Sequence, residues 1–118
     1  MTDNEIIVNG GNFNDSDISG AFANNLQSNV NVNDNRVKIN AGNGIRSVFG
    51  GYTRNGTASG NKVFIKNKVT IGGFVFGGAV NGNGNAESNE VTITDAAVGK
   101  DVYVGIIMGN GDAKDNKI

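Results

Sequence analysis

The residues able to do chemistry in this chain are carboxylates, amides, hydroxyls and amines, because the sequence contains no histidine and no cysteine. The lack of histidine excludes Ser-His-Asp and Cys-His catalysis and the usual imidazole metal ligands. The lack of cysteine excludes disulfides, zinc-thiolate sites and thiol nucleophiles. A pair of carboxylates, as in glycoside hydrolases, remains the main catalytic arrangement to seek, at about 5 Å in retaining or about 6.5–9.5 Å in inverting enzymes.

One cluster of oxygen-bearing side chains, Asn14, Asp15 and Asp17, is the candidate metal site, and calcium is the metal it suits. The cluster follows a Gly-Gly pair, as in the β-roll motif Gly-Gly-x-Gly-x-Asp, but Phe13 stands where that motif has glycine. The other glycine- and asparagine-rich loops offer mostly neutral amides. The competing interpretation is that these side chains form Asx-turns with backbone N–H groups. We expect no other metal and no cofactor.

The overall composition narrows the function classes further. The chain has 118 residues and a net charge of -1, from 10 Lys+Arg against 11 Asp+Glu. This length fits one domain, and the charge balance gives no broad basic surface for nucleic acid or anionic membranes. No apolar run approaches the ~20 residues that span a bilayer, and the N-terminus lacks the basic and apolar regions of a signal peptide. We therefore expect no nucleic-acid partner and no membrane insertion.

Glycine and asparagine dominate the composition, with 19 glycines and 21 asparagines, together 40 of 118 residues. Both residues tolerate the positive φ that tight turns require, and here they alternate with short β-branched strings. Leucine occurs once, at Leu26, so amphipathic helices are hard to build. Only residues 21–27 could form two helical turns. This pattern predicts short strands joined by tight turns, with helix nearly absent.

An internal repeat runs through the chain. The pattern Asn-(charged)-Val/Ile-x-Ile/Val begins at positions 4, 35, 61, 89 and, in broken form, 116, so the spacings are 31, 26, 28 and 27 residues. Val-Phe-Gly-Gly at 48–51 and 75–78, Val-Tyr-Val-Gly at 102–105, and Asn-Gly at 55, 83 and 110 keep the same phase. The repeats are therefore 4–34, 35–60, 61–88, 89–115 and a partial 116–118.

Each repeat is predicted to form three short strands and a polar turn. In the third copy these are 62–65, a strand around Val69 and Ile71, and 74–80, with 81–88 as the polar connection. One such coil cannot bury its apolar face, but stacked coils share a continuous core. We predict an all-β single domain over 1–118, a parallel β-helix (β-solenoid) of about four coils with a ~27-residue repeat. The alternative, a sandwich or meander of antiparallel hairpins, gives no reason for one constant phase.

The repeat phase predicts which side chains share a column on successive coils. One column should form an amide ladder at a corner of the coils. Its members are Asn35, Asn61, Asn89 and Asn116. The charged residues that follow these asparagines alternate in sign at most steps, which favours stacking at strand spacing. The positions predicted to share one core are Val63, Ile65, Val69, Ile71, Val91, Ile93 and Val98.

The same alignment bears on catalysis. In the phased region no column holds two carboxylates: Glu87 aligns with Lys114, and Glu90 with Lys117. The carboxylate pair that glycoside hydrolysis requires is therefore not expected. We predict that the protein is not an enzyme.

Two predicted strands, 74–80 and 102–108, are apolar on both faces. Whichever of Val75 and Phe76 points inward, the other faces outward with its column and needs cover from a partner chain, a folded-back loop or a ligand such as a sugar on the rings. The second of these strands also lies at a coil edge, where unpaired backbone groups promote association. We predict self-association, with a homodimer favoured over a filament. The predicted interface comprises Tyr103, Val104, Ile106, Ile107 and Met108.

The repeat resembles that of Gram-negative autotransporter passenger domains, with large surface adhesins of fusobacterial type as the nearest match. The residues that carry the resemblance are 48–52 (Val-Phe-Gly-Gly-Tyr), 75–78 and 83–89 (Asn-Gly-Asn-Ala-Glu-Ser-Asn). It covers 35–118 well and 1–34 loosely. The resemblance implies a right-handed parallel β-helix at the cell surface, acting in adhesion and virulence or as a rigid stalk.

These considerations lead to one functional expectation with two alternatives. We expect a non-enzymatic structural or adhesive module that is a fragment of a longer exported protein, exposed at the cell surface or secreted. A host-surface protein or glycan is the partner that this role implies. The first alternative is a small standalone, self-assembling β-solenoid, which would be cytoplasmic if the chain is complete. The second, less favoured, is a carbohydrate-binding or carbohydrate-processing β-helix.

Overall fold

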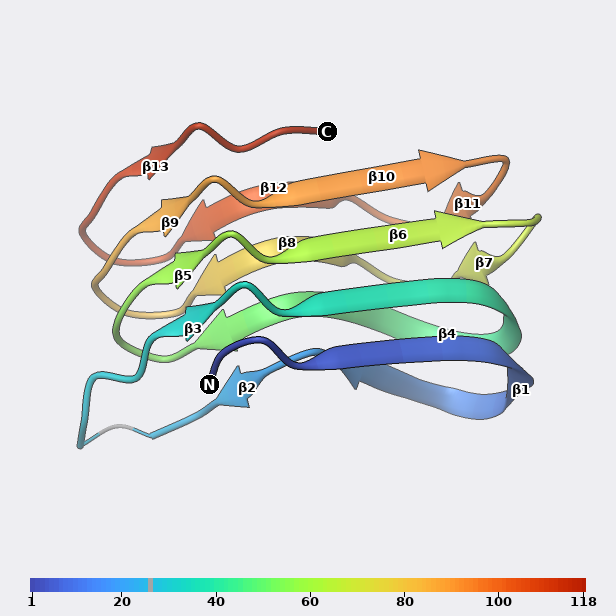
Figure 1. The fold of residues 1–118 in the computed structure, drawn as a ribbon, viewed down its shortest axis with the longest axis horizontal. Coiled ribbons are helices and arrows are strands. Elements are labelled where there is room, and N and C mark those ends of the chain that lie inside the picture. The colour runs from blue at the N-terminus through green and yellow to red at the C-terminus, as the bar shows by residue number, and fades with distance from the viewer. Residues whose placement is uncertain (26) are drawn as a thin grey trace.

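The computed structural model describes residues 1–25 and 27–118, and it is a parallel β-solenoid of stacked coils (Figure 1). Every strand pairing is parallel, which excludes the antiparallel alternative. In Figure 1 the chain runs to the right along the near strands, returns behind them and rises, so the winding is right-handed, as the resemblance implied. None of the described residues is helical; of the segment considered for a helix, Phe22–Ala23 is a strand and Leu26 lies outside the described residues.

The coils differ in how their strands are divided. In the first two coils a single long strand bends around a corner, whereas the later coils break it into three. The strands are β1 (Glu5–Ser19), β2 (Phe22–Ala23), β3 (Val32–Asn33), β4 (Arg36–Thr53), β5 (Ala58–Ser59), β6 (Lys62–Lys66), β7 (Thr70–Ile71), β8 (Val75–Val80), β9 (Ala86–Glu87), β10 (Glu90–Thr94), β11 (Ala97–Val98), β12 (Val102–Ile107) and β13 (Ala113–Lys114).

The register between coils is the one that the repeat predicts. Val63 pairs with Val91 and Val75 with Val102, so residues 28 and 27 apart are direct neighbours. The predicted core positions lie in one apolar cluster, five of them buried and Ile93 and Val98 partly buried against it. A smaller second cluster of alanines and valines lies at the other end of each coil. The predictions of fold class and core are confirmed.

A short strand in each coil was not predicted. Residues 81–88 were expected to be a polar connection, yet they contain β9, which stacks between β5 and β13 in a separate four-stranded sheet. The strand exists because its alanines are inward: Ala58 and Ala86 are fully buried in the second cluster. A strand of two residues is too short to show any alternation, and its signal was an alanine recurring in phase at 58, 86 and 113.

The predicted asparagine ladder forms the corner before β4, β6 and β10. Asn61 Nδ2 donates to Asn89 Oδ1 at 3.0 Å and to the carbonyl of Val32 at 2.8 Å. Its Oδ1 accepts from the backbone N–H of Asn35 at 3.1 Å and from Asn35 Nδ2 at 3.0 Å. Asn35, Asn61 and Asn89 are fully buried, so these bonds satisfy groups that would otherwise be costly to desolvate.

The residue before each ladder asparagine adopts the left-handed conformation. The φ values of Asp3, Asp34, Gly60, Ser88 and Asp115 lie between 54 and 65°. Aspartate and glycine tolerate this region better than most residues, because aspartate can bond locally and glycine has no Cβ. The tight bend turns each asparagine side chain toward the inside of the coil, where the ladder runs.

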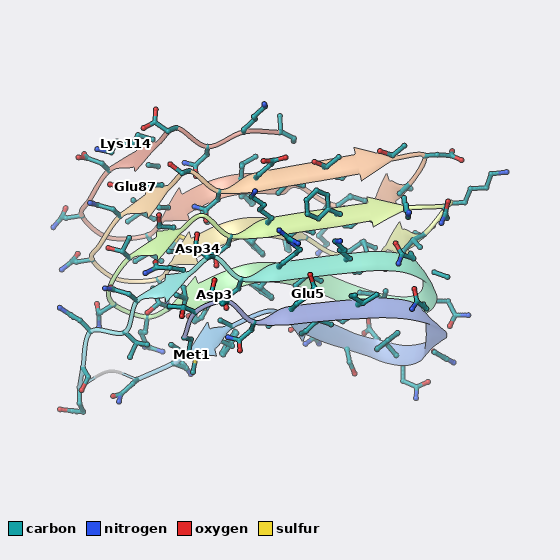
Figure 2. The ribbon with its side chains drawn as sticks, viewed as in Figure 1. Met1, Asp3, Glu5, Asp34, Glu87 and Lys114 are labelled. Carbon is teal, nitrogen blue, oxygen red and sulfur yellow. The ribbon has the colours of Figure 1, made fainter. Side chains whose placement is uncertain are left out.

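The charged columns contribute less than the ladder. Arg36 Nη1 lies 3.3 Å from Glu5 Oε2, and Lys114 Nζ lies 3.7 Å from Glu87 Oε1, the latter pair lying one above the other in Figure 2. The next pair in register, Lys62 and Glu90, makes no ion pair within the described chain. Exposed pairs of this kind are each worth about 0–1 kcal/mol. The coils are therefore held mainly by core and ladder, not by surface charge.

Candidate functional site

The predicted interface residues lie on β12 and just after it, but they do not share a face. Val104 packs against the main core cluster and Ile107 against the smaller one. Tyr103 and Ile106, which alternate with them, face outward, and Met108 is 69% exposed. The surface available to a partner is therefore made by Tyr103, Ile106 and Met108, while the other two stabilise the coil.

On β8, the neighbour of β12, the aromatic column faces outward and the valine column faces inward. Val75 is fully buried and Phe76 is half-buried, which decides the question that the sequence left open. The reason is the narrow spacing between walls: a Cβ on Gly77 would lie 3.2 Å from Val91 Cγ2, so this strand lies close to the facing wall. Valine fits that spacing, and the bulkier ring turns outward.

The outward rings cover one another. Phe49 and Phe76 stack with centroids 4.7 Å apart and planes 8° apart, and Phe76 and Tyr103 with centroids 5.5 Å apart and planes 13° apart. A second stack pairs Phe22 with Tyr52 at 4.3 Å. Stacked rings present their edges outward, so this column does not offer ring faces to a sugar. The rings of this face therefore shield much of one another's apolar surface from solvent.

A small apolar hollow interrupts this face beside Ala79. In the column that runs from Tyr52 through Ala79 to Ile106, the middle side chain is a single methyl group. The hollow encloses about 80 Å³ and is bordered also by Phe76 and Met108. Its size suits one apolar side chain of a partner, not a small-molecule ligand, because ligand pockets are usually about 300–1,000 Å³.

The proposed calcium ligands lie on β1, and basic groups are close to them. Asp17 is bound in a two-pronged pair, with Arg46 Nε and Nη2 each 3.0 Å from a carboxylate oxygen. These hydrogen bonds, with the charges of Asp17 and Asp15, raise the pKa of Arg46. Asp15 and Asp17 border one hollow together with Arg46 and Lys100. The backbone N–H of Asn14 donates to Asn12 Oδ1 at 3.0 Å, which is an Asx-type contact.

Two carboxylates stacked on adjacent coils were not predicted. Asp3 and Asp34 occupy the same left-handed turn position, and Figure 2 shows them one above the other. Both border a hollow of about 160 Å³ that also contains Arg36 and Lys62, whose charges balance theirs. The available signal was that aspartate directly precedes the ladder asparagine in both coils.

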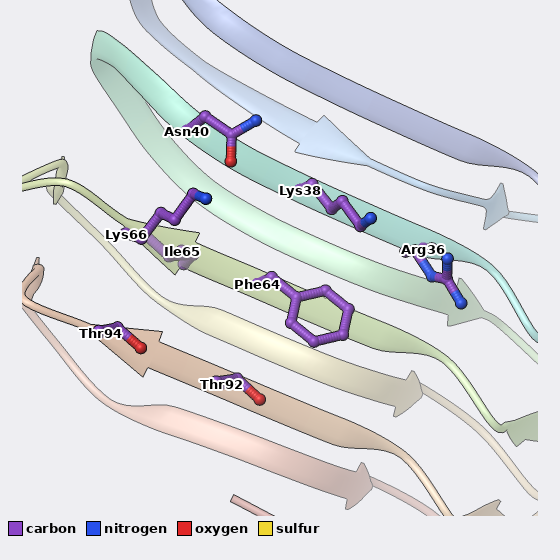
Figure 3. Close-up of a pocket in the computed structure, with 8 residues that line it drawn as sticks. All are labelled: Arg36, Lys38, Asn40, Phe64, Ile65, Lys66, Thr92 and Thr94. Atoms are coloured by element: carbon purple, nitrogen blue, oxygen red, sulfur yellow. The ribbon is translucent and has the colours of Figure 1, made fainter.

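A mixed basic and aromatic hollow lies on the outer face of β4, β6 and β10 (Figure 3). It encloses about 390 Å³, within the usual size range of ligand sites. Phe64 lies at its centre, with Lys38 Nζ 6.0 Å from the ring centroid. The lining residues are Arg36, Lys38, Asn40, Phe64, Ile65, Lys66, Thr92 and Thr94. No sequence pattern indicates this site, because its members come from three different coils.

Comparison with known proteins adds no family to these observations. No protein-family model matches the chain, and neither a curated protein nor a solved structure matches it. No helix among the described residues is long and apolar enough to cross a membrane. Among the same residues, no three acidic side chains are grouped so that they could hold a metal ion. The geometry of the solenoid and its outer faces therefore carries the functional argument.

Proposed function

We propose that this chain is a structural and adhesive repeat module, displayed at a bacterial cell surface as part of a longer exported protein. The asparagine ladder is the observation that carries the proposal. It joins each coil to the next through side chains that are fully buried at three successive coils. A rod whose every coil is bonded to its neighbours in this way suits a load-bearing stalk.

The adhesive part of the proposal rests on the contrast between the inside and the outside of the coils. Inward columns repeat nearly the same residue, as in Val37, Val63 and Val91. The outward column beside it changes from Lys38 to Phe64 to Thr92. A constant interior with a variable exterior is how solenoid repeats present extended binding surfaces on a uniform scaffold. The resemblance to autotransporter passengers supports the same role.

The structural part can be tested by pulling single molecules of the whole chain from its two ends. We expect stepwise extension, since one coil of 27 residues releases roughly 90 Å when it unravels. The variant Asn61→Ala should unravel at lower force, because it removes the central rung of the ladder. Extension without resolved steps, or an unchanged force in the variant, would contradict a load-bearing role.

The adhesive part needs a separate measurement. Beads coated with the folded chain should attach to cultured epithelial cells more than beads coated with the same chain after heat unfolding. Equal attachment of both would count against a specific adhesive surface. That outcome would not bear on the structural role, which the pulling experiment tests separately.

A further inference from the structure

The hollow on the outer face of β4, β6 and β10 carries a positive charge that the surrounding protein does not neutralise. Arg36 is paired with Glu5 at 3.3 Å, but Lys38 and Lys66 make no ion pair within the described chain. The carboxylates of this face, Glu5 and Glu90, both lie in the edge column with Arg36. The other two outward columns of the hollow, those of Lys38 and Lys66, contain no carboxylate. An anion that enters the hollow therefore meets the lysines first.

Phe64 gives the hollow a ring on which no other aromatic ring of the described chain stacks, although Lys38 Nζ lies over one of its faces, 6.0 Å from the centroid. On the opposite wall each ring of the aromatic column stacks on another, whereas the neighbours of Phe64 in its column are Lys38 and Thr92. The ring is half-buried and borders the open hollow. An apolar ring face flanked by polar groups is the usual arrangement in sites that bind the face of a small ligand.

Two hydroxyls complete the site on the side of β10. Thr92 and Thr94 are exposed and lie in register with Phe64 and Lys66, one strand spacing away. Thr92 Oγ1 has one long contact, 3.5 Å to Glu90 Oε1, and is otherwise available to a ligand. The hollow thus combines lysine ammonium groups, a ring face and hydroxyls within three adjacent strands (Figure 3).

We propose that this hollow binds an acidic saccharide, a sugar unit that carries a carboxylate or a sulfate. The sugar ring packs on Phe64, its acidic group lies between Lys38 and Lys66, and Thr92 and Thr94 bond its hydroxyls. This inference rests on the adhesive part of the proposed function and names the ligand class. Nucleic acid is a poorer fit, because a net charge of -1 and three lining cations fall short of the many phosphate contacts that such binding needs.

The test is a titration of the isotope-labelled full chain, followed by NMR of its backbone amides. The probes are an oligosaccharide ending in N-acetylneuraminic acid, a sulfated disaccharide, and the neutral form of each. We expect shifts confined to β4, β6 and β10 with the carboxylated or the sulfated sugar, weaker at high salt, and none with the neutral sugars. The acidic probe that binds identifies whether the anion is a carboxylate or a sulfate.

Variants make the assignment specific. Lys38→Gln with Lys66→Gln should weaken binding at least about tenfold, since charge-assisted hydrogen bonds are lost. Phe64→Leu should weaken it about fivefold by removing the ring face. Lys100→Gln is the matched control, because Lys100 also lies over a phenylalanine, 5.4 Å from the centroid of Phe74, but at a different place. Thermal unfolding of each variant checks that it is folded.

Several results would overturn the site. These are no response to either acidic sugar, equal binding of the neutral sugars, or the same loss of affinity in Lys100→Gln. Tighter binding to single-stranded DNA or to phosphatidylserine vesicles would reassign the hollow to a different class of partner. If neither acidic sugar shifts any amide but the coated beads still attach to cells, the saccharide site is refuted and the adhesive function stands. If a sugar binds but the beads do not attach, the adhesive function is refuted and the saccharide site stands.

Discussion

At the scale of single residues, the two adjacent glycines of each Val-Phe-Gly-Gly string are needed for different steric reasons. A Cβ on Gly77 would lie 2.5 Å from the carbonyl oxygen of Val104, so this position lets the next coil approach closely. A Cβ on Gly78 would lie 2.5 Å from the side chain of Asn89, so that position makes room for the ladder. Both distances are shorter than side-chain carbons tolerate, which explains why glycine recurs there.

Gly78→Ala should therefore destabilise the fold by about 1–3 kcal/mol, as overpacking of a close-packed interior does. Gly72→Ala is the control, because a Cβ there would meet its nearest atom, the carbonyl oxygen of Ile45, at 3.7 Å. It should change the free energy of unfolding by no more than about 1 kcal/mol. Urea unfolding followed by circular dichroism measures both, and equal stability of the two variants would contradict the packing argument.

Tyr103 offers a prediction about protonation at the same scale. Its hydroxyl donates to Asp101 Oδ2 at 3.2 Å, and this hydrogen bond, with the charge of Asp101, raises the pKa of Tyr103. A raised pKa in the folded state means that the contribution to stability is present below the ordinary tyrosine pKa of about 10 and is lost as the pH rises through the folded value. The dependence of stability on pH that this group causes is therefore confined to alkaline pH, where the contribution is lost.

Asp101→Asn should lower the pKa of Tyr103, because it removes the negative charge that opposes phenolate formation. The titration is followed by the ultraviolet absorbance of the phenolate. Since the chain has two tyrosines, both forms are compared in a Tyr52→Phe background. An unchanged titration would show that Asp101 is not the cause of the shift.

At the scale of elements, the ladder at the corner between β5 and β6 holds strands that are each too short to be stable alone. Asn61→Ala leaves the Nδ2 group of Asn35 and the carbonyl of Val32 without these partners in the buried interior. We expect a loss of about 2–4 kcal/mol in the free energy of unfolding. Asn40→Ala removes one exposed amide bond, to Asn9, and should cost within about 0.5 kcal/mol.

Thermal or urea unfolding of the two asparagine variants separates a buried rung from a surface amide. Similar losses in both would mean that the ladder is no more important than an exposed hydrogen bond. A loss confined to Asn61→Ala would make the corner ladder, together with the core, the main source of cohesion between coils.

At the scale of the whole molecule, the outward side of β12 remains the surface where we expect self-association. Among the described strands β12 pairs with β8 alone, and its outward side chains Tyr103 and Ile106 continue into the exposed Met108. Unpaired strand edges next to apolar side chains favour pairing with another chain. The hollow beside Ala79 gives such a contact one pocket for a side chain.

Ile106→Lys is the informative change, because Ile106 faces outward, whereas Ile107 packs against the core and its replacement would unfold the coil edge. We expect the unmodified chain to be dimeric at high micromolar concentration and the variant to be monomeric, as measured by size-exclusion chromatography with light scattering. Ile7→Lys, at a residue 50% exposed on β1, is the control and should leave the dimer intact. A monomeric unmodified chain would refute the prediction.

The sequence by itself determined the coil, its phase and its columns. A parallel stack places like residues in direct register, so the recurrence of asparagine at 35, 61, 89 and 116 was enough to locate the ladder, and that of valine and isoleucine to locate the core. The handedness came from the resemblance alone. These features could be predicted because each depends on spacing along the chain and on nothing else.

Tertiary structure decided what depends on the distance between walls and on neighbours across coils. Val75 and Phe76 are equally apolar, so alternation could not say which was buried until the narrow gap beside Gly77 excluded the ring. The same holds for the lysine and phenylalanine hollow. Lys38, Phe64 and Thr92 are separated by 26 and 28 residues and carry no common motif, so only the stacking of three coils shows that they meet.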